Sequence, residues 1–241
     1  MLLRPGRRCL VAAGVILGVS AACNTAGAAE TSKVMGSIEV AAGEHSGDVS
    51  TVSGSIRIGE SAVVGSAQAV NGSITLGPQA RAAALETVNG SIELARQARV
   101  SGEVHTVNGK LSLADGAEVG GALVNVNGAI RVAAAHVGGA IETVSGGIDL
   151  GPNAQVDGGI HVRKSGGWSL SLGSEDVPRI VIGPGTVVGG TLNFERKVSL
   201  YVSDKATIGP VQGATAVPGP MTMRGTSSEP KLNDHPPDLR T

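Results

Sequence analysis

Apolar residues along this chain recur with short spacings that repeat through most of its length. One eight-residue pattern returns five times, as AVNGSITL, TVNGSIEL, TVNGKLSL, NVNGAIRV and TVSGGIDL. With one earlier copy included, the valine of the pattern recurs in steps of 18, 18, 19, 19 and 18 residues, at Val52, Val70, Val88, Val107, Val126 and Val144. A segment that returns at a fixed interval is typical of a repeat architecture in which each copy stacks on the next.

Within each interval the apolar residues lie six apart, as Val88, Leu94 and Val100 do, and a second apolar position such as Ile92 follows four residues after the valine. Glycine-rich or polar triplets, such as NGS at 89–91 and GPQ at 77–79, separate them and favour tight turns. The pattern therefore predicts an all-β fold, a three-sided parallel β-helix (β-solenoid) with about 18 residues per turn. Successive turns run in the same direction, so their ladders are parallel.

The two sides of the predicted strands are assigned from polarity. We expect the valine of the pattern to point into the core. We expect the position before it to face outward, because exposed strand positions commonly hold threonine. A flat row of hydroxyl groups there could also bind ice or a polymer lattice. This outward column contains Thr51, Ala69, Thr87, Thr106, Asn125 and Thr143.

The corner after the valine is built from Asn-Gly, or from Ser-Gly in some copies. We expect the asparagine amides to hydrogen-bond from turn to turn, and the glycines, such as Gly90, to adopt positive φ. Ser53 and Ser145 fall in the asparagine column. The predicted corner residues are Asn71, Gly72, Asn89, Gly90, Asn108, Gly109, Asn127, Gly128 and Gly146.

The chain divides into three parts. Residues 31–209 are predicted to form the β-solenoid, in about ten turns, with one bulged turn near 163–179 in which Trp168 and Leu172 keep the phase. The six-residue spacing resumes at Ile182, Val188 and Phe194. Residues 210–241 are rich in proline and charge, which predicts a disordered tail.

Residues 1–28 have the charged, apolar and small-residue parts of a secretory signal peptide. Two kinds of processing are open. The run SAAC at 20–23 resembles a bacterial lipoprotein box, which would place a lipid, and hence a membrane attachment, on Cys23; the alternative is simple cleavage after Ala28. Either event removes Cys9, so we expect no intramolecular disulfide in the mature protein.

Composition and charge narrow the functional classes. The 241 residues include 37 glycines but one Trp, one Tyr and one Phe, which suits a narrow aliphatic core. A formal net charge of −1 offers no basic stripe for nucleic acid. His105, His136 and His161 are too far apart in the predicted coil to share a metal, and the carboxylates are scattered. We therefore predict no catalytic, cofactor-binding or metal-binding residues and no cofactor.

The VNGSI, VNGKL and VSGGI units, over about residues 34–162 and more weakly to 209, resemble the repeats of an adhesin-like β-helix family of exported bacterial proteins. They are also similar to those of bactofilins, polymer-forming bacterial cytoskeletal proteins, which lack a cleaved signal. The resemblance implies a non-enzymatic structural or adhesive module of the periplasm, outer membrane or cell surface. Its partners would be further copies of itself, joined end to end or laterally, or an envelope polysaccharide or other surface ligand. The alternative is a trimeric hexapeptide-repeat enzyme, such as an acyltransferase or a carbonic anhydrase.

Overall fold

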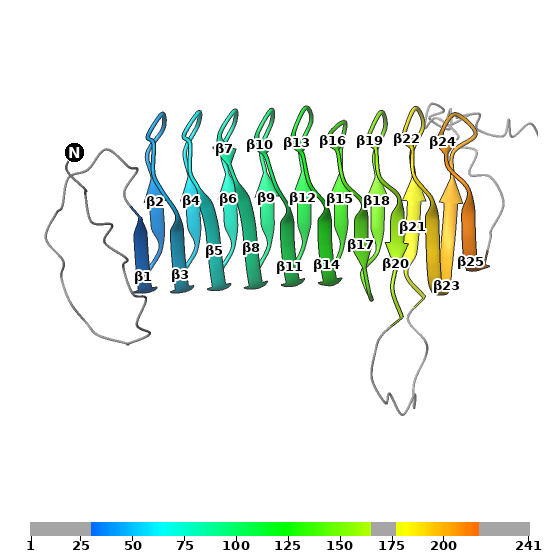
Figure 1. Ribbon diagram of the computed structural model, residues 1–241, viewed down its shortest axis with the longest axis horizontal. Coiled ribbons are helices and arrows are strands. Elements are labelled where there is room, and N and C mark those ends of the chain that lie inside the picture. The colour runs from blue at the N-terminus through cyan, green and yellow to red at the C-terminus, as the bar shows by residue number, and fades with distance from the viewer. Residues whose placement is uncertain (1–29, 165–176, 217–241) are drawn as a thin grey trace, which may run out of the picture.

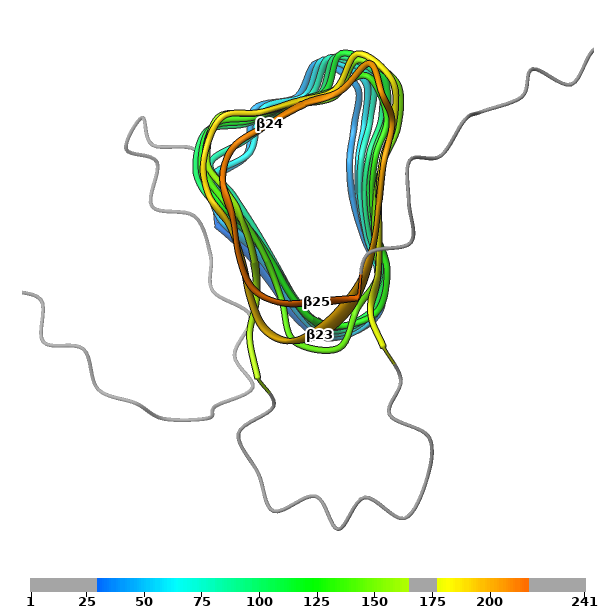
Figure 2. The ribbon, with the colours of Figure 1, turned by 90° about the vertical axis from the view of Figure 1, so that its right-hand side faces the viewer.

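The computed structural model describes residues 30–164 and 177–216, and these form one stack of parallel strands. Seen from the side, the strands succeed one another along a rod; seen end-on, the turns superimpose on a three-cornered outline (Figures 1 and 2). Paired residues in neighbouring turns are 18 or 19 apart through most of the rod, as for Ile74 with Ile92 and Ile92 with Leu111. The predicted three-sided parallel β-helix is confirmed, with about nine turns.

The strands lie on three faces, which we call faces 1, 2 and 3. Face 1 is formed by β1 (Thr31–Met35), β3 (Val49–Ser53), β5 (Ser66–Asn71), β8 (Ala84–Asn89), β11 (Val104–Asn108), β14 (Leu123–Asn127), β17 (Ile141–Thr143), β20 (Ile160–Val162), the start of β23 (Leu192–Val202) and β25 (Val211–Ala216). Face 2 is formed by β2 (Ile38–Val40), β4 (Ile56–Ile58), β6 (Ile74–Leu76), β9 (Ile92–Leu94), β12 (Leu111–Leu113), β15 (Ile130–Val132), β18 (Ile148–Leu150), β21 (Arg179–Ile182) and the end of β23.

Face 3 consists of two-residue strands, preceded by single bridges from His45 to Val63 and from Val63 to Arg81. Its strands are β7 (Arg81–Ala82), β10 (Arg99–Val100), β13 (Glu118–Val119), β16 (His136–Val137), β19 (Gln155–Val156), β22 (Val187–Val188) and β24 (Thr207–Ile208). Among the described residues there is no helix long and apolar enough to cross a membrane.

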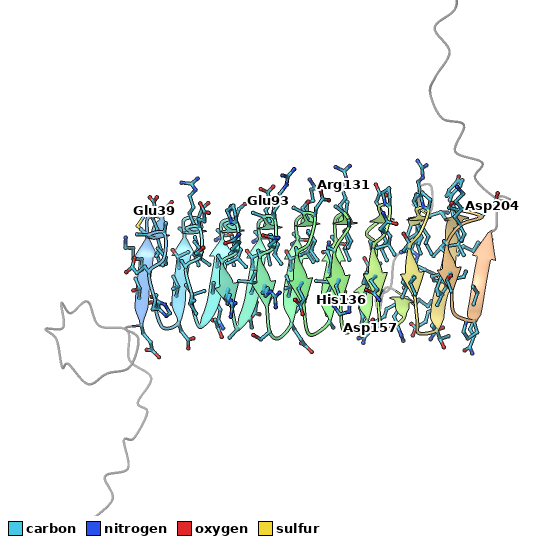
Figure 3. All side chains as sticks on the ribbon, turned by 90° about the horizontal axis from the view of Figure 1, so that it is seen from above. Glu39, Glu93, Arg131, His136, Asp157 and Asp204 are labelled. Carbon is cyan, nitrogen blue, oxygen red and sulfur yellow. The ribbon has the colours of Figure 1, made fainter. Side chains whose placement is uncertain are left out.

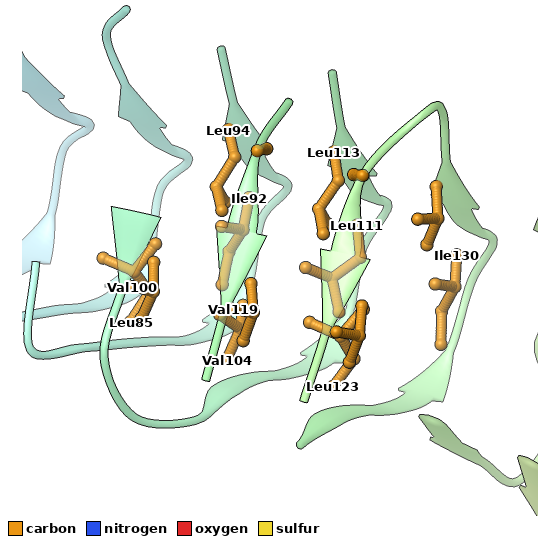
Figure 4. Close-up of a cluster of buried hydrophobic side chains, with 14 of the residues drawn as sticks. Leu85, Ile92, Leu94, Val100, Val104, Leu111, Leu113, Val119, Leu123 and Ile130 are labelled. Atoms are coloured by element: carbon orange, nitrogen blue, oxygen red, sulfur yellow. The ribbon is translucent and has the colours of Figure 1, made fainter. Parts of the chain in front are cut away.

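The core is a set of stacked aliphatic columns. Leu111 and Leu113 of one turn lie in register with Ile92 and Leu94 of the turn before, and all four are buried. Figure 4 shows these side chains pointing into the same narrow interior. Each turn buries too little apolar surface to offset the entropy lost in ordering its backbone, so contacts shared between turns stabilise the fold.

The predicted sides of the face 1 strands are wrong at two positions. Val52, Val70 and Val88 are 45%, 41% and 37% exposed, and the valines at the equivalent positions further on are half-buried. The preceding column, predicted to face outward, is buried instead: Thr51, Ala69, Thr87, Thr106, Asn125 and Thr143. Successive side chains of a strand point to opposite sides. In β8 the buried Leu85 therefore places Thr87 inside the coil and Val88 outside.

The corner between faces 2 and 3 is a hydrogen-bonded four-residue turn. The amide of Ala80 donates to the carbonyl oxygen of Gly77 at 3.2 Å, and Gln79 between them has a φ of 58°. Proline second and a left-handed residue third are features of a type II turn. Left-handed φ thus occurs at this corner in turn after turn, at Gly43, Ser61, Gln79, Gln97, Gly116, Asn153 and Gly185.

One turn is much longer than the others. Ile148 pairs with Ile180, a step of 32 residues, and the extra residues fall at the corner between β20 and β21. Trp168 and Leu172, predicted to keep the phase there, lie outside the described residues. The six-residue spacing then returns in buried residues, Ile182, Val188, Phe194 and Leu200.

The C-terminal end of the coil differs from the expected boundary. β25 pairs with β23 and extends the sheet to Ala216, beyond residue 209. β23 also runs without a break around the corner between faces 1 and 2, where Glu195, Arg196 and Lys197 stand in place of the Asn-Gly corner. Cys9, Cys23, Ala28 and residues 217–241 lie outside the described part of the chain.

Candidate functional site

The asparagine column forms a ladder along the corner between faces 1 and 2. Asn89 Nδ2 donates to Asn71 Oδ1 at 2.9 Å, Asn108 donates to Asn89 at 3.1 Å, and Asn127 donates to Asn108 at 3.0 Å. The predicted turn-to-turn amide bonds are confirmed, and Ser53 is in register with Asn71. Because each amide bonds to the next, we assign this column a structural role.

The glycines beside the asparagines are required by close packing. A Cβ atom on Gly90 would lie 2.1 Å from the carbonyl oxygen of Gly72. A Cβ atom added to Gly54, Gly72, Gly109, Gly128 or Gly146 would lie 1.9–2.2 Å from the carbonyl oxygen of the glycine in the preceding turn. Gly36, Gly54 (φ 151°) and Gly128 (φ 127°) of this column have positive φ, but Gly90 does not, so the reason predicted for Gly90 is wrong. Neighbouring backbones approach too closely at this corner for any side chain.

The buried threonines bond to these glycines. Thr87 Oγ1 donates to the carbonyl oxygen of Gly72 at 2.9 Å, and Thr106 does the same to Gly90 at 3.2 Å. Where the column holds asparagine, Asn125 Nδ2 donates to Gly109 at 3.1 Å. A partly buried carbonyl gains a partner in this way. In each T-V-N-G unit the threonine thus bonds to a glycine carbonyl from inside the coil and the valine faces outward. The asparagine joins the amide ladder, and the glycine allows the close contact between backbones.

The three histidines are not brought together. His105 and His161 occupy one outward column of face 1, three turns apart, with Val124 and Glu142 between them. His136 lies on face 3, next to the shortened corner at residues 133–135, and its Nε2 is 2.8 Å from Asp157 Oδ2. Over residues 30–164 and 177–216, no group of three or more His, Cys, Asp or Glu side chains could hold a metal ion.

Ion pairs at the surface join some neighbouring turns. Arg99 Nη1 is 3.2 Å from Glu118 Oε2 on face 3, and Arg163 Nη2 is 2.6 Å from Glu142 Oε2. The guanidinium of Arg179 lies 4.9 Å from the ring centre of Tyr201 on face 2. Such exposed pairs contribute little to stability.

Face 2 carries a groove of about 510 Å³ that crosses several turns. Its outward column reads Thr75, Glu93, Ser112, Arg131 and Asp149 in register. The short Ser112 lies between the long Glu93 and Arg131, with Lys110 also at the groove. Figure 3 shows Glu93 and Arg131 projecting along one long side of the rod, away from His136 and Asp157.

The groove is lined mainly by apolar and small residues, between side chains of both charges. Ser112 Oγ is buried and has no hydrogen-bond partner. A second hollow of about 440 Å³ continues past Arg131 and Asp149 to Arg179. Cationic and anionic side chains along a line suit an extended polymer that carries polar and charged groups.

Sequence reasoning missed this groove and the exposed valines. A signal for the groove was present in the sequence, because the short Ser112 lies between the longer Glu93 and Arg131 at the same position of neighbouring turns. The outward position of the valines could not have been predicted from hydrophobicity, because hydrophobicity favours burying an apolar side chain.

Comparison of the chain with models of known protein families gave no match, and comparisons with curated proteins and with solved structures also gave none. Its function therefore has to be argued from the residues and their geometry.

Proposed function

We propose that this protein is an exported, non-enzymatic structural or adhesive module of the bacterial cell envelope. The observation that carries the proposal is the uninterrupted stack of in-register turns from β1 to β25. A rod whose neighbouring turns share a continuous core and parallel ladders is stiff and holds its outward side chains at fixed intervals. Such a module can present columns of outward side chains to a ligand and can act as a spacer between two attachment points.

The adhesive surface in this proposal is the groove of face 2. Five outward residues, from Thr75 to Asp149, line it at one per turn, which makes it about 20 Å long at the usual strand spacing. Its ligand would be an envelope polysaccharide, whose polar and charged groups can meet Glu93, Arg131 or Lys110. A repeating polymer suits a site that repeats along the rod.

Export is tested on the full chain expressed in a bacterium. Fractionation followed by intact-mass measurement distinguishes a chain cleaved after Ala28, a chain lipidated at Cys23 and an unprocessed chain. Either processed form in the envelope fraction supports the proposal. An unprocessed chain in the cytoplasm overturns it.

Adhesion is tested by co-sedimentation with purified envelope polysaccharide. Replacing Ser112 by Phe fills the groove and is expected to abolish binding. Replacing Gln155 by Phe, on the exposed outward column of face 3, is the matched control and should leave binding unchanged. Equal binding by both variants would exclude the groove as the adhesive surface.

Electron microscopy of the processed protein tests the structural role. Separate rods would fit a spacer or adhesive module, and filaments would show that the open ends of the coil stack on one another. Compact trimers would contradict the proposal and favour the hexapeptide-repeat enzyme.

A further inference from the structure

The outward valines of face 1 form one continuous apolar stripe, which we call the valine stripe. The register of β1 with β3, and of each following pair, aligns them at one per turn. The stripe consists of Val34, Val52, Val70, Val88, Val107, Val126 and Val144. Exposure is highest at Val34, at 72%, and a hollow of about 240 Å³ lies along the first four valines.

The uniformity of this stripe is not explained by folding. The outward column of face 2 reads Glu, Arg, Thr, Glu, Ser, Arg and Asp over the same seven turns. The outward column of face 3 holds His, Val, Arg, Arg, Glu, His and Gln. The coil thus accepts many residue types at outward positions, yet one outward column of face 1 holds valine every time. Valine suits a strand position, but the other two outward columns show that the coil does not require it there.

The residues beside the stripe suit a protein interface. On one side of the valine stripe lie Ser50 and Gln68, which also line the hollow of about 240 Å³. On the other side lies the asparagine ladder. These flanks are mostly polar, and Glu86 and Glu142 place two carboxylates among them. An apolar centre with a polar rim is the usual anatomy of a protein interface.

We propose that the valine stripe is the lateral contact between two copies of this chain, laid face 1 against face 1. The partner must itself present apolar groups at the spacing of one turn, and a second copy has that spacing by construction. The same patch then serves both copies, as in a two-fold dimer.

The available area is sufficient for such a contact. Seven turns at about 4.8 Å and five-residue strands at about 3.3 Å per residue give a flat area of about 500 Å² on each copy. Both copies together bury about 1,000 Å², which is the lower limit for a specific interface. This inference does not depend on the envelope role, because it concerns how two rods associate wherever they are located.

The test is the mass of the full chain in solution, measured by sedimentation velocity and equilibrium over a range of concentrations. Val70→Glu places a carboxylate in the stripe. Val187→Glu, on face 3, is the matched control, because the two valines are 41% and 40% exposed. We expect wild type and Val187→Glu to dimerise with equal affinity, and Val70→Glu to raise the dissociation constant about tenfold or more.

A variant with Val52, Val70 and Val88 all changed to Ser checks that the loss does not come from misfolding. It should be monomeric with an unchanged circular dichroism spectrum. A monomeric wild type, or equal association by Val70→Glu and Val187→Glu, would overturn the inference. Fractionation of the same strains reports export separately, so failure of dimerisation and failure of the envelope proposal can be told apart.

Discussion

Thr87 reaches from inside the coil to the preceding turn, where its Oγ1 donates a hydrogen bond of 2.9 Å to the carbonyl oxygen of Gly72. The two residues are 15 apart in the sequence and belong to different repeats. The bond joins a buried hydroxyl to a corner whose backbone excludes every side chain. It explains why threonine, and not a larger aliphatic residue, lies inside this part of each turn.

Replacing Thr87 by Val should lower the free energy of unfolding by about 1–2 kcal/mol, because the partly buried Gly72 carbonyl loses its side-chain donor. Urea unfolding measures the change. Thr75→Val, the same substitution on the outward side of β6, should change stability by about 0.5 kcal/mol or less. Equal effects at the two sites would show that the hydrogen bond is unimportant.

Replacing Ala69 by Thr should raise stability by about 0.5–1.5 kcal/mol. Ala69 occupies the inward column between Thr51 and Thr87, and a threonine there can donate to the carbonyl of Gly54 as its neighbours do to their glycines. Thermal unfolding of the variant, with Ala83→Thr at an exposed position as the control, checks this. A lower melting temperature would mean that the column has no room for the larger side chain.

Replacing Gly90 by Val should destabilise the protein by about 3 kcal/mol or more, since its Cβ would overlap the carbonyl oxygen of Gly72 and force two turns apart. Ala83→Val in the same turn lies at an exposed position and should be close to neutral. An unchanged melting temperature for Gly90→Val would disprove the close approach of the two backbones.

Replacing Leu94 by Asp should destabilise the coil severely, by about 3 kcal/mol or more, because Leu94 is 2% exposed and a carboxylate there has no charged partner in the aliphatic core. Circular dichroism is expected to show an unfolded or partly folded chain at neutral pH. The exposed Ser101→Asp serves as the control. A fully folded Leu94→Asp protein would contradict the assignment of the face 2 columns to the core.

The asparagine ladder offers a graded test. Asn108→Ala removes two amide bonds, one to Asn89 and one from Asn127, whereas Asn127→Ala removes the bond to Asn108. Since the ladder is exposed, each bond should be worth about 0.5 kcal/mol, and the loss at Asn108 should be about twice that at Asn127. Chemical unfolding of both variants gives the ratio, and an effect at Asn127 as large as that at Asn108 would argue against a chain of coupled amides.

The period, the three faces and the aliphatic columns such as Ile92 and Leu94 could be predicted from the sequence, because each depends on spacing along the chain. The asparagine ladder could be predicted too, since a fixed period places identical residues one above another. Which side of the strand holds Thr87 and which holds Val88 depends on contacts between turns. Hydrophobicity favours burying the valine, but the hydroxyl has its acceptor in the preceding turn, and strand alternation from Leu85 leaves the valine outside. The need for Gly90 likewise comes from the carbonyl of Gly72, a neighbour that exists only once the coil has closed.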